Sequence, residues 1–208
     1  MKGLFISFEG PDGSGKTTQI RLLTEHCTQK GLKVLSTREP GGTPISEKIR
    51  EIILDNRNKE MAPAAEALLY AASRAQLVDQ VIKPALQEGT IVLSDRFMDS
   101  SIAYQGYGRG LGDGVRVINE FAIQDLQPDL TFFLNVDPAV GKKRVLAEGA
   151  PDRMESEAMT FHNKVYQGYL ELSRIYQDRY VVIDAARSIE EIAELIRTRV
   201  DAYVAERA

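Results

Sequence analysis

The chain has 208 residues, of which 43% are apolar and 27% charged, a composition typical of one globular domain. Its net charge of −4 argues against non-specific binding to nucleic acid or to an anionic membrane. The single cysteine, Cys27, excludes a disulfide within the chain, and we expect it to pack in the core. No apolar run is long enough to span a membrane, and a glycine-rich motif begins too early to follow a signal peptide. We therefore expect a cytoplasmic protein.

Five short apolar segments predict β-strands, at residues 4–8, 33–37, 90–94, 130–136 and 180–183. Segments with helical spacing lie between them, and this alternation predicts a parallel sheet with right-handed crossovers. No repeat, low-complexity tract or linker divides the chain, so we expect one domain over residues 1–208.

Three features predict where helices begin or end. Ser188 and Glu191 form the pattern of a capping box before the last helix. Pro84 should kink or end the helix that begins near Pro63. The segment 99–110 is rich in glycine and tyrosine and should not form one long regular helix, but a loop or short helix that lines a site.

Residues 10–17 match the phosphate-binding pattern G-x-x-x-x-G-K-[ST] in full, between a predicted strand and a predicted helix. Glycine permits a curled backbone whose N–H groups point inward, and the helix N-terminus adds partial positive charge. Lys16 can then reach the phosphates of a nucleoside triphosphate, and the Thr17 hydroxyl can hold Mg²⁺. The alternative is a glycine turn with a solvated Lys16, but the strand and helix around it favour phosphate binding. The predicted fold is thus a three-layer α/β fold of P-loop NTPase type, with helices flanking a five-stranded parallel sheet.

Charged residues follow two predicted strands, at the edge where open α/β sheets bind ligands. Arg38 precedes a Pro-Gly-Gly turn, and its guanidinium suits a phosphate group, although pairing with Glu39 is an equal alternative. Asp95 ends the third strand, as an Mg²⁺-binding carboxylate does in such folds, and Arg96 follows it. The alternative there is a simple Asp95–Arg96 salt bridge.

Tyr70 and Arg74 lie four residues apart and share one helix face, where a ring and a guanidinium can bind a base. Packing of Tyr70 in the core, covered by Arg74, is the alternative. Farther along, Lys142, Lys143, Arg144 and Arg153 flank a Gly-Ala-Pro break. We expect a mobile lid at about 142–155 that closes over polyphosphate, the alternative being a solvated helix end.

Together these motifs resemble those of the thymidylate kinases over nearly the whole chain. The matching segments are 8–18, 37–43, 95–97 and 103–106 (Phe-Glu-Gly-Pro-Asp-Gly-Ser-Gly-Lys-Thr-Thr, Thr-Arg-Glu-Pro-Gly-Gly-Thr, Asp-Arg-Phe and Ala-Tyr-Gln-Gly). The resemblance implies transfer of a phosphoryl group from ATP, with Mg²⁺, to thymidine monophosphate (dTMP), giving the diphosphate. It also implies a homodimer packed through helices, and the apolar segment 62–75 is compatible with one.

The resemblance assigns the acceptor site residue by residue. Arg38 and Arg96 clamp the acceptor phosphate. Tyr70, where relatives usually have phenylalanine, stacks on thymine, and Arg74 bonds a thymine carbonyl. The remaining implied contacts are Ser101 and Gln105 with the base edge, Tyr104 with the sugar, where it disfavours a 2′-hydroxyl, and Asp12 with the 3′-hydroxyl.

The implied donor site comprises Gly10, Pro11, Asp12, Gly13, Ser14, Gly15, Lys16, Thr17, Thr18 and Arg144, with Thr17 and Asp95 at the metal. Some family members carry a catalytic arginine where this chain has Gly13. Others place it in the lid, and Arg153 matches that arrangement, so Lys16, Arg96, Arg153 and Asp12 are the implied catalytic residues. Arg144 matches a lid arginine that stacks on adenine. The resemblance also suggests a cis peptide bond before Pro40.

We expect direct in-line transfer without a general base, because the acceptor phosphate is already ionised at neutral pH. Two alternatives remain open at this stage. One is a kinase for another nucleoside monophosphate or a deoxynucleoside, which a panel of acceptors would separate. The other is a nucleotide switch with slow turnover, although the chain has no Asn-Lys-x-Asp segment for guanine.

Overall fold

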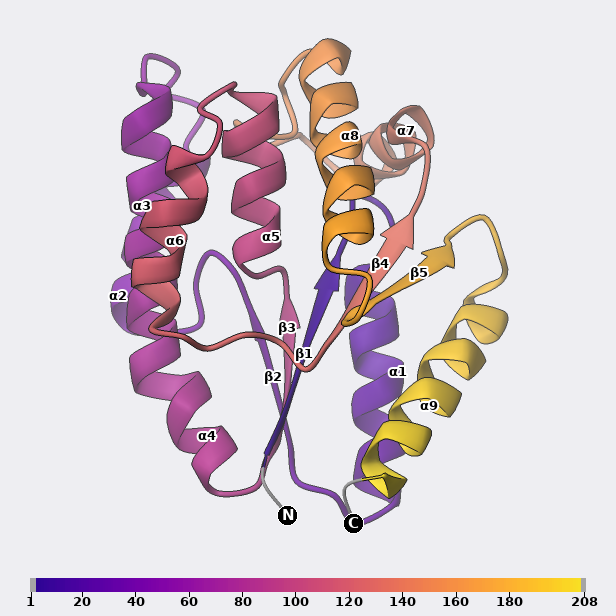
Figure 1. Ribbon diagram of the computed structural model, residues 1–208. Helices are drawn as coiled ribbons and strands as arrows, with labels where there is room; N and C mark the ends of the chain where they lie inside the picture. Colours follow the sequence, from indigo (N-terminus) through magenta and orange to yellow (C-terminus); the bar gives the residue numbers. More distant parts are fainter. Residues whose placement is uncertain (1–2, 207–208) are drawn as a thin grey trace.

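A five-stranded parallel sheet lies between two helical layers in the computed structural model, which describes residues 3–206 (Figure 1). The strands are β1 Leu4–Glu9, β2 Val34–Arg38, β3 Ile91–Asp95, β4 Leu130–Asn135 and β5 Tyr180–Asp184. Their order is β2-β3-β1-β4-β5, and all neighbouring pairs are parallel. The predicted fold class is confirmed, and each predicted strand end lies within one residue of the observed end.

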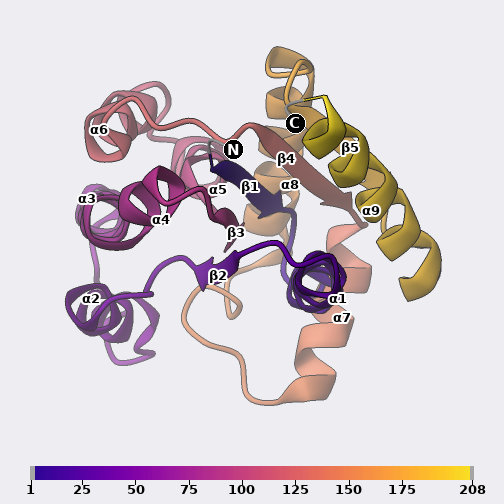
Figure 2. The ribbon, with the colours of Figure 1, turned by 90° about the horizontal axis from the view of Figure 1, so that it is seen from below.

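Helices cover both faces of the sheet (Figure 2). They are α1 Lys16–Gln29, α2 Pro44–Leu54, α3 Pro63–Leu77, η1 Val78–Ile82, α4 Lys83–Gln87, α5 Met98–Ser101, η2 Ile102–Gly108, α6 Gly114–Ile123, α7 Pro138–Glu148, α8 Met159–Ile175 and α9 Ile189–Ala205, where η denotes a π-helix. The segment from η2 packs closely against α8, and α1 packs against α9. The alternating chain of strands and helices thus winds into the three expected layers.

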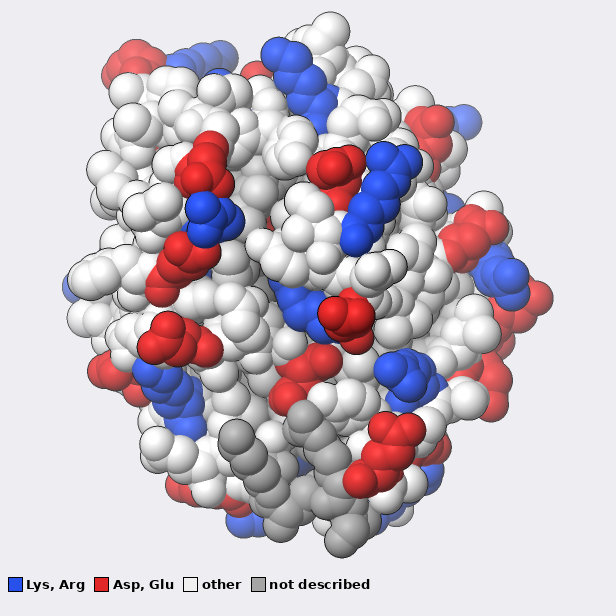
Figure 3. Space-filling view, in the orientation of Figure 1, with Lys and Arg blue, Asp and Glu red and all other residues white. Residues whose placement is uncertain are grey.

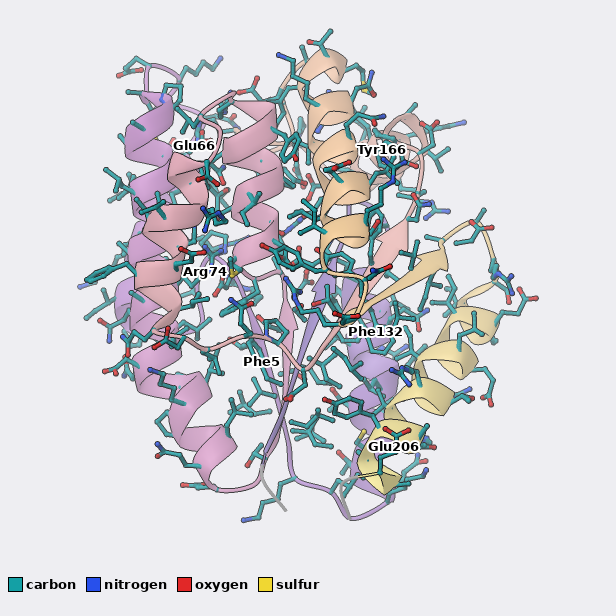
Figure 4. The ribbon with its side chains drawn as sticks, in the orientation of Figure 1. Phe5, Glu66, Arg74, Phe132, Tyr166 and Glu206 are labelled. Atoms are coloured by element: carbon teal, nitrogen blue, oxygen red, sulfur yellow. The ribbon has the colours of Figure 1, made fainter. Side chains whose placement is uncertain are left out.

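Alternation along β1 divides its side chains between two cores, because successive residues of a strand point to opposite faces. Ile6 and Phe8 pack with residues of α1 and α9. Phe5 packs on the opposite face with residues of α3, η1 and α8. Phe5 and Phe132 both lie in the interior in Figure 4. Every residue of β1 is buried, as a strand covered on both faces requires.

Several local predictions are confirmed. Ser188 and Glu191 form a capping box, Cys27 is buried in the core, and the Glu39–Pro40 peptide bond is cis. Segment 99–110 is not one regular helix, since it contains the end of α5 and the π-helix η2. The helix before Pro84 does not stop there; it passes through the π-helical turn η1, and Pro84 lies in the first turn of α4, where its missing N–H needs no partner. Within residues 3–206, no helix combines the length and apolar character that a membrane span requires.

Candidate active site

The carboxyl ends of β1, β2 and β3 bring the sequence motifs to one edge of the sheet (Figure 1). Asp95 pairs in register with Phe8 of β1 on one side and with Arg38 of β2 on the other. The phosphate loop follows β1 directly. Because β3 lies between β1 and β2, Asp95 and Arg96 are nearer the loop than Arg38 is.

The phosphate loop has the curled backbone that its glycines allow. Gly10, Gly13 and Gly15 have φ angles of 142°, 72° and 94°, in the region that favours glycine. Lys16 begins α1 and folds back over the loop, where its Nζ donates to the carbonyl oxygens of Gly10 at 3.2 Å and Pro11 at 3.0 Å. A bound polyphosphate would offer this ammonium group a stronger acceptor than the two carbonyls.

Lys16 is only 6% exposed, and its surroundings disfavour its charge. Burial and the nearby Arg96 guanidinium lower the pKa of Lys16 to about 8, although the carboxylates of Asp95 and Asp12 act in the opposite direction. An anion at this position would restore the positive charge.

Thr17 and Asp95 have the chemistry expected of magnesium ligands. The Thr17 hydroxyl donates to Asp95 Oδ2 at 2.8 Å, and both residues line the cavity over the phosphate loop. Among the described residues, no group of three or more His, Cys, Asp or Glu side chains forms a metal site. Mg²⁺ commonly takes only one or two protein oxygens and completes its shell with phosphates and water, so this pair fits the ion.

The cavity over the phosphate loop, called the donor cavity here, is lined from several strand ends and helices. Its lining includes residues 12–19, Arg38, Asp95, Arg96, Arg144 and Arg187. Arg144 of α7 also donates from Nη1 to the carbonyl oxygen of Gly13 at 3.1 Å, which joins the lid helix to the loop. Gly10 and Pro11 do not line this cavity, but their carbonyl oxygens hold the Lys16 ammonium group, which does. The expected donor residues therefore come together.

A second cavity, called the acceptor cavity, lies beside it. All the residues expected to bind the acceptor nucleotide except Arg38 lie in its lining: Asp12, Tyr70, Arg74, Arg96, Ser101, Tyr104 and Gln105. Asp12 and Arg96 line both cavities. Glu39, Arg50 and Glu155 line both cavities as well, so the two cavities adjoin along these residues.

Arg96 is held at that junction by the surrounding side chains. Its Nη2 lies 2.5 Å from Asp12 Oδ1, and its Nη1 donates to Tyr169 Oη at 2.9 Å and to Ser100 Oγ at 3.1 Å. Its φ of 71° is in the left-handed region that non-glycine residues rarely adopt, which is a common feature of functional sites. Tyr104 donates from its hydroxyl to Asp12 Oδ2 at 2.8 Å, so Asp12 bridges two acceptor-site residues.

Glu9 supports this arrangement from beneath. It accepts hydrogen bonds from the Phe97 backbone N–H at 2.8 Å, the Ser100 hydroxyl at 2.6 Å and the Tyr169 hydroxyl at 3.2 Å. Burial, together with the nearby carboxylate of Asp99, raises the pKa of Glu9 to about 8.

Arg74 is buried, and its guanidinium makes four hydrogen bonds and an ion pair with protein groups. Nε and Nη2 pair with Glu39, Nη2 also donates to the Phe97 carbonyl at 3.1 Å, and Nη1 donates to Ser101 Oγ at 2.9 Å and to Asn119. Arg74 also lines the acceptor cavity, and the thymine contact that the resemblance implies for it stays a prediction. Ser101 accepts from Arg74, so its own proton is available to a ligand.

The structure does not bring Arg153 to the phosphate loop. Its side chain is buried, donates from Nε to the Ile53 carbonyl at 2.6 Å and pairs with Glu66 at 2.7 Å. It lines neither cavity, whereas Arg144 lines the donor cavity. Arg38 also differs from the expectation: it pairs with Glu47 rather than Glu39 and lines the donor cavity, not the acceptor cavity.

Several residues of the site had no assigned role in the sequence. Arg50 and Glu39 line both cavities, and Arg187 lines the donor cavity. The sequence offers a signal for Glu39, because it lies inside segment 37–43, which matches the family motif. Arg50 follows it on the next helix without a local signal.

The phosphate loop and the second cavity facing it are the geometry of a nucleotide kinase, and comparisons identify which kind. The family model described as "Thymidylate kinase" matches residues 8–196. Proteins named thymidylate kinase are 52% identical over 202 residues in Lactobacillus acidophilus, covering 95% of this chain and 94% of that protein, and 53% identical over 203 residues in Lactobacillus helveticus, covering 94% of both. The chain belongs to the thymidylate kinase family.

A solved structure agrees with this conclusion. The crystal structure of thymidylate kinase from Ehrlichia chaffeensis matches with a TM-score of 0.79 and 32% identity, over 97% of this chain and 99% of that chain. Thymidylate kinases phosphorylate dTMP to the diphosphate, with ATP as the phosphoryl donor and Mg²⁺ as the cofactor. The alternatives of another monophosphate kinase or a nucleotide switch are thereby set aside.

Proposed function

We propose that ATP occupies the donor cavity and dTMP the acceptor cavity, with their phosphates meeting beside Asp12 and Arg96. The observation that supports this assignment is that these two residues line both cavities. An acceptor phosphate beside Arg96 would face the donor phosphates above Lys16. The protein's part in the reaction is therefore to position two anions and to offset their repulsion.

The donor side is held mainly by the phosphate loop. Lys16 and the loop N–H groups bind the polyphosphate, and Arg144 reaches over it from α7. Thr17 and Asp95 hold Mg²⁺, which when bound neutralises charge on the donor phosphates. The catalytic lid cation in this assignment is Arg144, because Arg153 is paired with Glu66 away from the donor cavity.

The acceptor side is held by residues of α3, α5 and η2 and of the loops that follow β1 and β3. Arg96 binds the phosphate, and Asp12 orients Arg96 and approaches the sugar with Tyr104. Tyr70 stacks on the base, while Gln105 and Ser101 bond its edge. Arg74 fixes Ser101, because its Nη1 donates to the Ser101 hydroxyl oxygen.

Replacement of Arg96 tests the assignment of the two cavities. Arg96→Gln should raise the KM for dTMP about 10- to 100-fold, the usual cost of a lost hydrogen bond to a charged group, with a smaller change in the KM for ATP. Steady-state kinetics with each substrate varied in turn would measure this. Arg21→Gln is the matched control, because Arg21 is exposed on α1 and pairs only with Glu25. An unchanged KM for dTMP in Arg96→Gln would contradict the assignment.

The assembly we propose is a homodimer of single-domain chains in the cytoplasm. Leu68 of α3 and Val117 and Phe121 of α6 are large apolar side chains that are 56%, 56% and 87% exposed. The two helices pack together and lie side by side in Figures 1 and 2, so these side chains belong to one region. Segment 142–155 serves as the lid of the same domain. On the face drawn in Figure 3, the described basic and acidic side chains are interspersed without a continuous basic stripe, as expected for an enzyme of small substrates.

A further inference from the structure

Glu66 is a completely buried carboxylate without a role in the family resemblance or in the site assignment above. It lies on α3, four residues before Tyr70 and eight before Arg74, so all three are on related turns of the same helix. Figure 4 shows Glu66 and Arg74 in the region between α3 and α5, and Arg74 lines the acceptor cavity. A buried charge needs partners, and those of Glu66 come from two different parts of the chain.

The partners of Glu66 are two arginines and one amide. Arg109 donates from Nε at 3.0 Å and from Nη2 at 2.9 Å, and Arg153 Nη2 lies at 2.7 Å. Gln105 donates from Nε2 to Glu66 Oε1 at 3.0 Å. Burial alone would raise the pKa of Glu66, but the hydrogen bonds from Arg109 and Gln105 and the charge of Arg109 outweigh burial and hold it below its ordinary value. Glu66 is therefore ionised at neutral pH.

An ionised carboxylate fixes which way the Gln105 amide faces. Carboxylate oxygens only accept hydrogen bonds, so the amide must turn its Nε2 toward Glu66. The other polar atom, Oε1, then remains for a ligand, since Gln105 lines the acceptor cavity and no donor among residues 3–206 bonds this oxygen. The acceptor cavity thus presents a hydrogen-bond acceptor at Gln105.

We infer that Glu66 is a positioning residue for base selection, which holds the Gln105 carbonyl toward the base so that the site takes pyrimidines with a proton on N3. Thymine and uracil donate from N3–H to this oxygen, whereas cytosine would place an N3 lone pair against it. This inference rests on the proposed contact between Gln105 and the base. It identifies Glu66 as the group that decides whether Gln105 accepts or donates the hydrogen bond with the base.

The alternative is that Glu66 serves only to hold Arg109 and Arg153 in place. The ratio of kcat/KM for dTMP to kcat/KM for dCMP distinguishes the two roles, because a loss of this anchoring would affect both substrates alike. Only the orientation of the Gln105 amide distinguishes a base with N3–H from one without it.

Glu66→Gln is the direct test. An amide at residue 66 can donate as well as accept, so Gln105 becomes free to turn over. The ratio of kcat/KM for dTMP to that for dCMP should fall about tenfold, as should the dUMP to dCMP ratio, while the dTMP to dUMP ratio stays constant because both bases carry N3–H. The matched control is Arg109→Gln, which removes another partner of Glu66 but leaves its carboxylate, and it should preserve the dTMP to dCMP ratio. An unchanged ratio in Glu66→Gln, or an equal fall in Arg109→Gln, would overturn the inference.

Gln105→Leu separates a failure of the proposed contact between Gln105 and the base from a failure of the role inferred for Glu66. If this variant keeps the dTMP to dCMP ratio, Gln105 does not contact the base, and both the site assignment and the inference fail. If its ratio falls but that of Glu66→Gln does not, only the inference fails.

A measurement on the unaltered protein covers the case in which Glu66→Gln does not fold. The side-chain amide protons of ¹⁵N-labelled Gln105, identified by their loss in Gln105→Leu, should be protected from exchange in the free protein and should stay protected with dTMP bound. Rapid exchange in the free protein would overturn the inference.

Discussion

Lys16 and Arg96 are two cations that lie close together in the buried region where the two cavities adjoin. Their repulsion mainly affects the protonation of Lys16. Arginine stays charged under all ordinary conditions, whereas a lysine ammonium can lose its proton when it is buried beside another cation. The lowered pKa of Lys16, about 8, reflects both effects. The free site is thus prepared for an anion that removes the unfavourable charge repulsion.

ATP binding should therefore take up protons near pH 8. Lys16 is then about half neutral in the free protein, and the polyphosphate raises its pKa, so binding must add about half a proton. Below pH 7 Lys16 is already charged and contributes no uptake, and above pH 8 the affinity for ATP should fall as pH rises. Calorimetric titration with ATP at pH 8, in two buffers of different ionisation enthalpy, would measure the uptake. Lys16→Met should abolish it, and equal heats in both buffers with unaltered protein would contradict the prediction.

The lid helix α7 rests on the phosphate loop through two glycines. A Cβ at Gly13 would collide with the Gly141 carbonyl, and a Cβ at Gly141 would collide with the Asp12 carbonyl. This contact explains why the loop has no room for an arginine at residue 13 in this structure. It also holds Arg144, one turn along α7, against the Gly13 carbonyl.

Gly141→Ala should separate α7 from the phosphate loop. The added methyl group overpacks a contact between two backbone segments, at a typical cost of ~1–3 kcal/mol. We expect the KM for ATP to rise about tenfold, because Arg144 moves away with the helix. Kinetics and thermal unfolding would measure both effects. Gly149→Ala is the control in the same lid, since nothing lies within 4 Å of its added Cβ; an equal change in the two variants would argue against the contact.

The accuracy of sequence-based prediction depends on how local the determining interactions are. The strands and the phosphate loop follow from periodicity and from a contiguous motif, and both were predicted with ends within one residue. The π-helical turns were not foreseen, because one extra residue per turn leaves the apolar pattern nearly unchanged. The close contact of Gly13 and Gly141 joins residues far apart in sequence and has no local signal.

Arg153 shows the same limit at the site. An arginine after a Gly-Ala-Pro break fits two placements equally well, in a lid over phosphate or in a buried ion pair. The deciding partner, Glu66, lies on another helix far earlier in the chain. Arg74 lines the acceptor cavity, but its contacts with Glu39, Ser101 and Asn119 follow only from the packing of four elements.

At the level of the whole molecule, α3 has two functional faces. Its inner face carries Tyr70 and Arg74 in the acceptor cavity, while Leu68 points outward beside the exposed side chains of α6. A second copy covering Leu68, Val117 and Phe121 would remove an apolar surface from water and at the same time fix the helix that supports base recognition.

Phe121→Asp should convert the proposed homodimer to a monomer. Phe121 is the most exposed large apolar side chain described, at 87%, and a charge there would be buried without a partner in the dimer. Loss of such an aromatic anchor typically weakens association by at least ~30-fold. Sedimentation at several concentrations should show a dimer for the unaltered protein and a monomer for the variant. Leu195→Asp is the matched control, because Leu195 is 44% exposed on α9, which packs against α1 on the other face of the sheet from α3, and it should leave the dimer intact. A monomeric unaltered protein, or a dimeric Phe121→Asp, would refute this interface, and dissociation by Leu195→Asp would instead place it at α9.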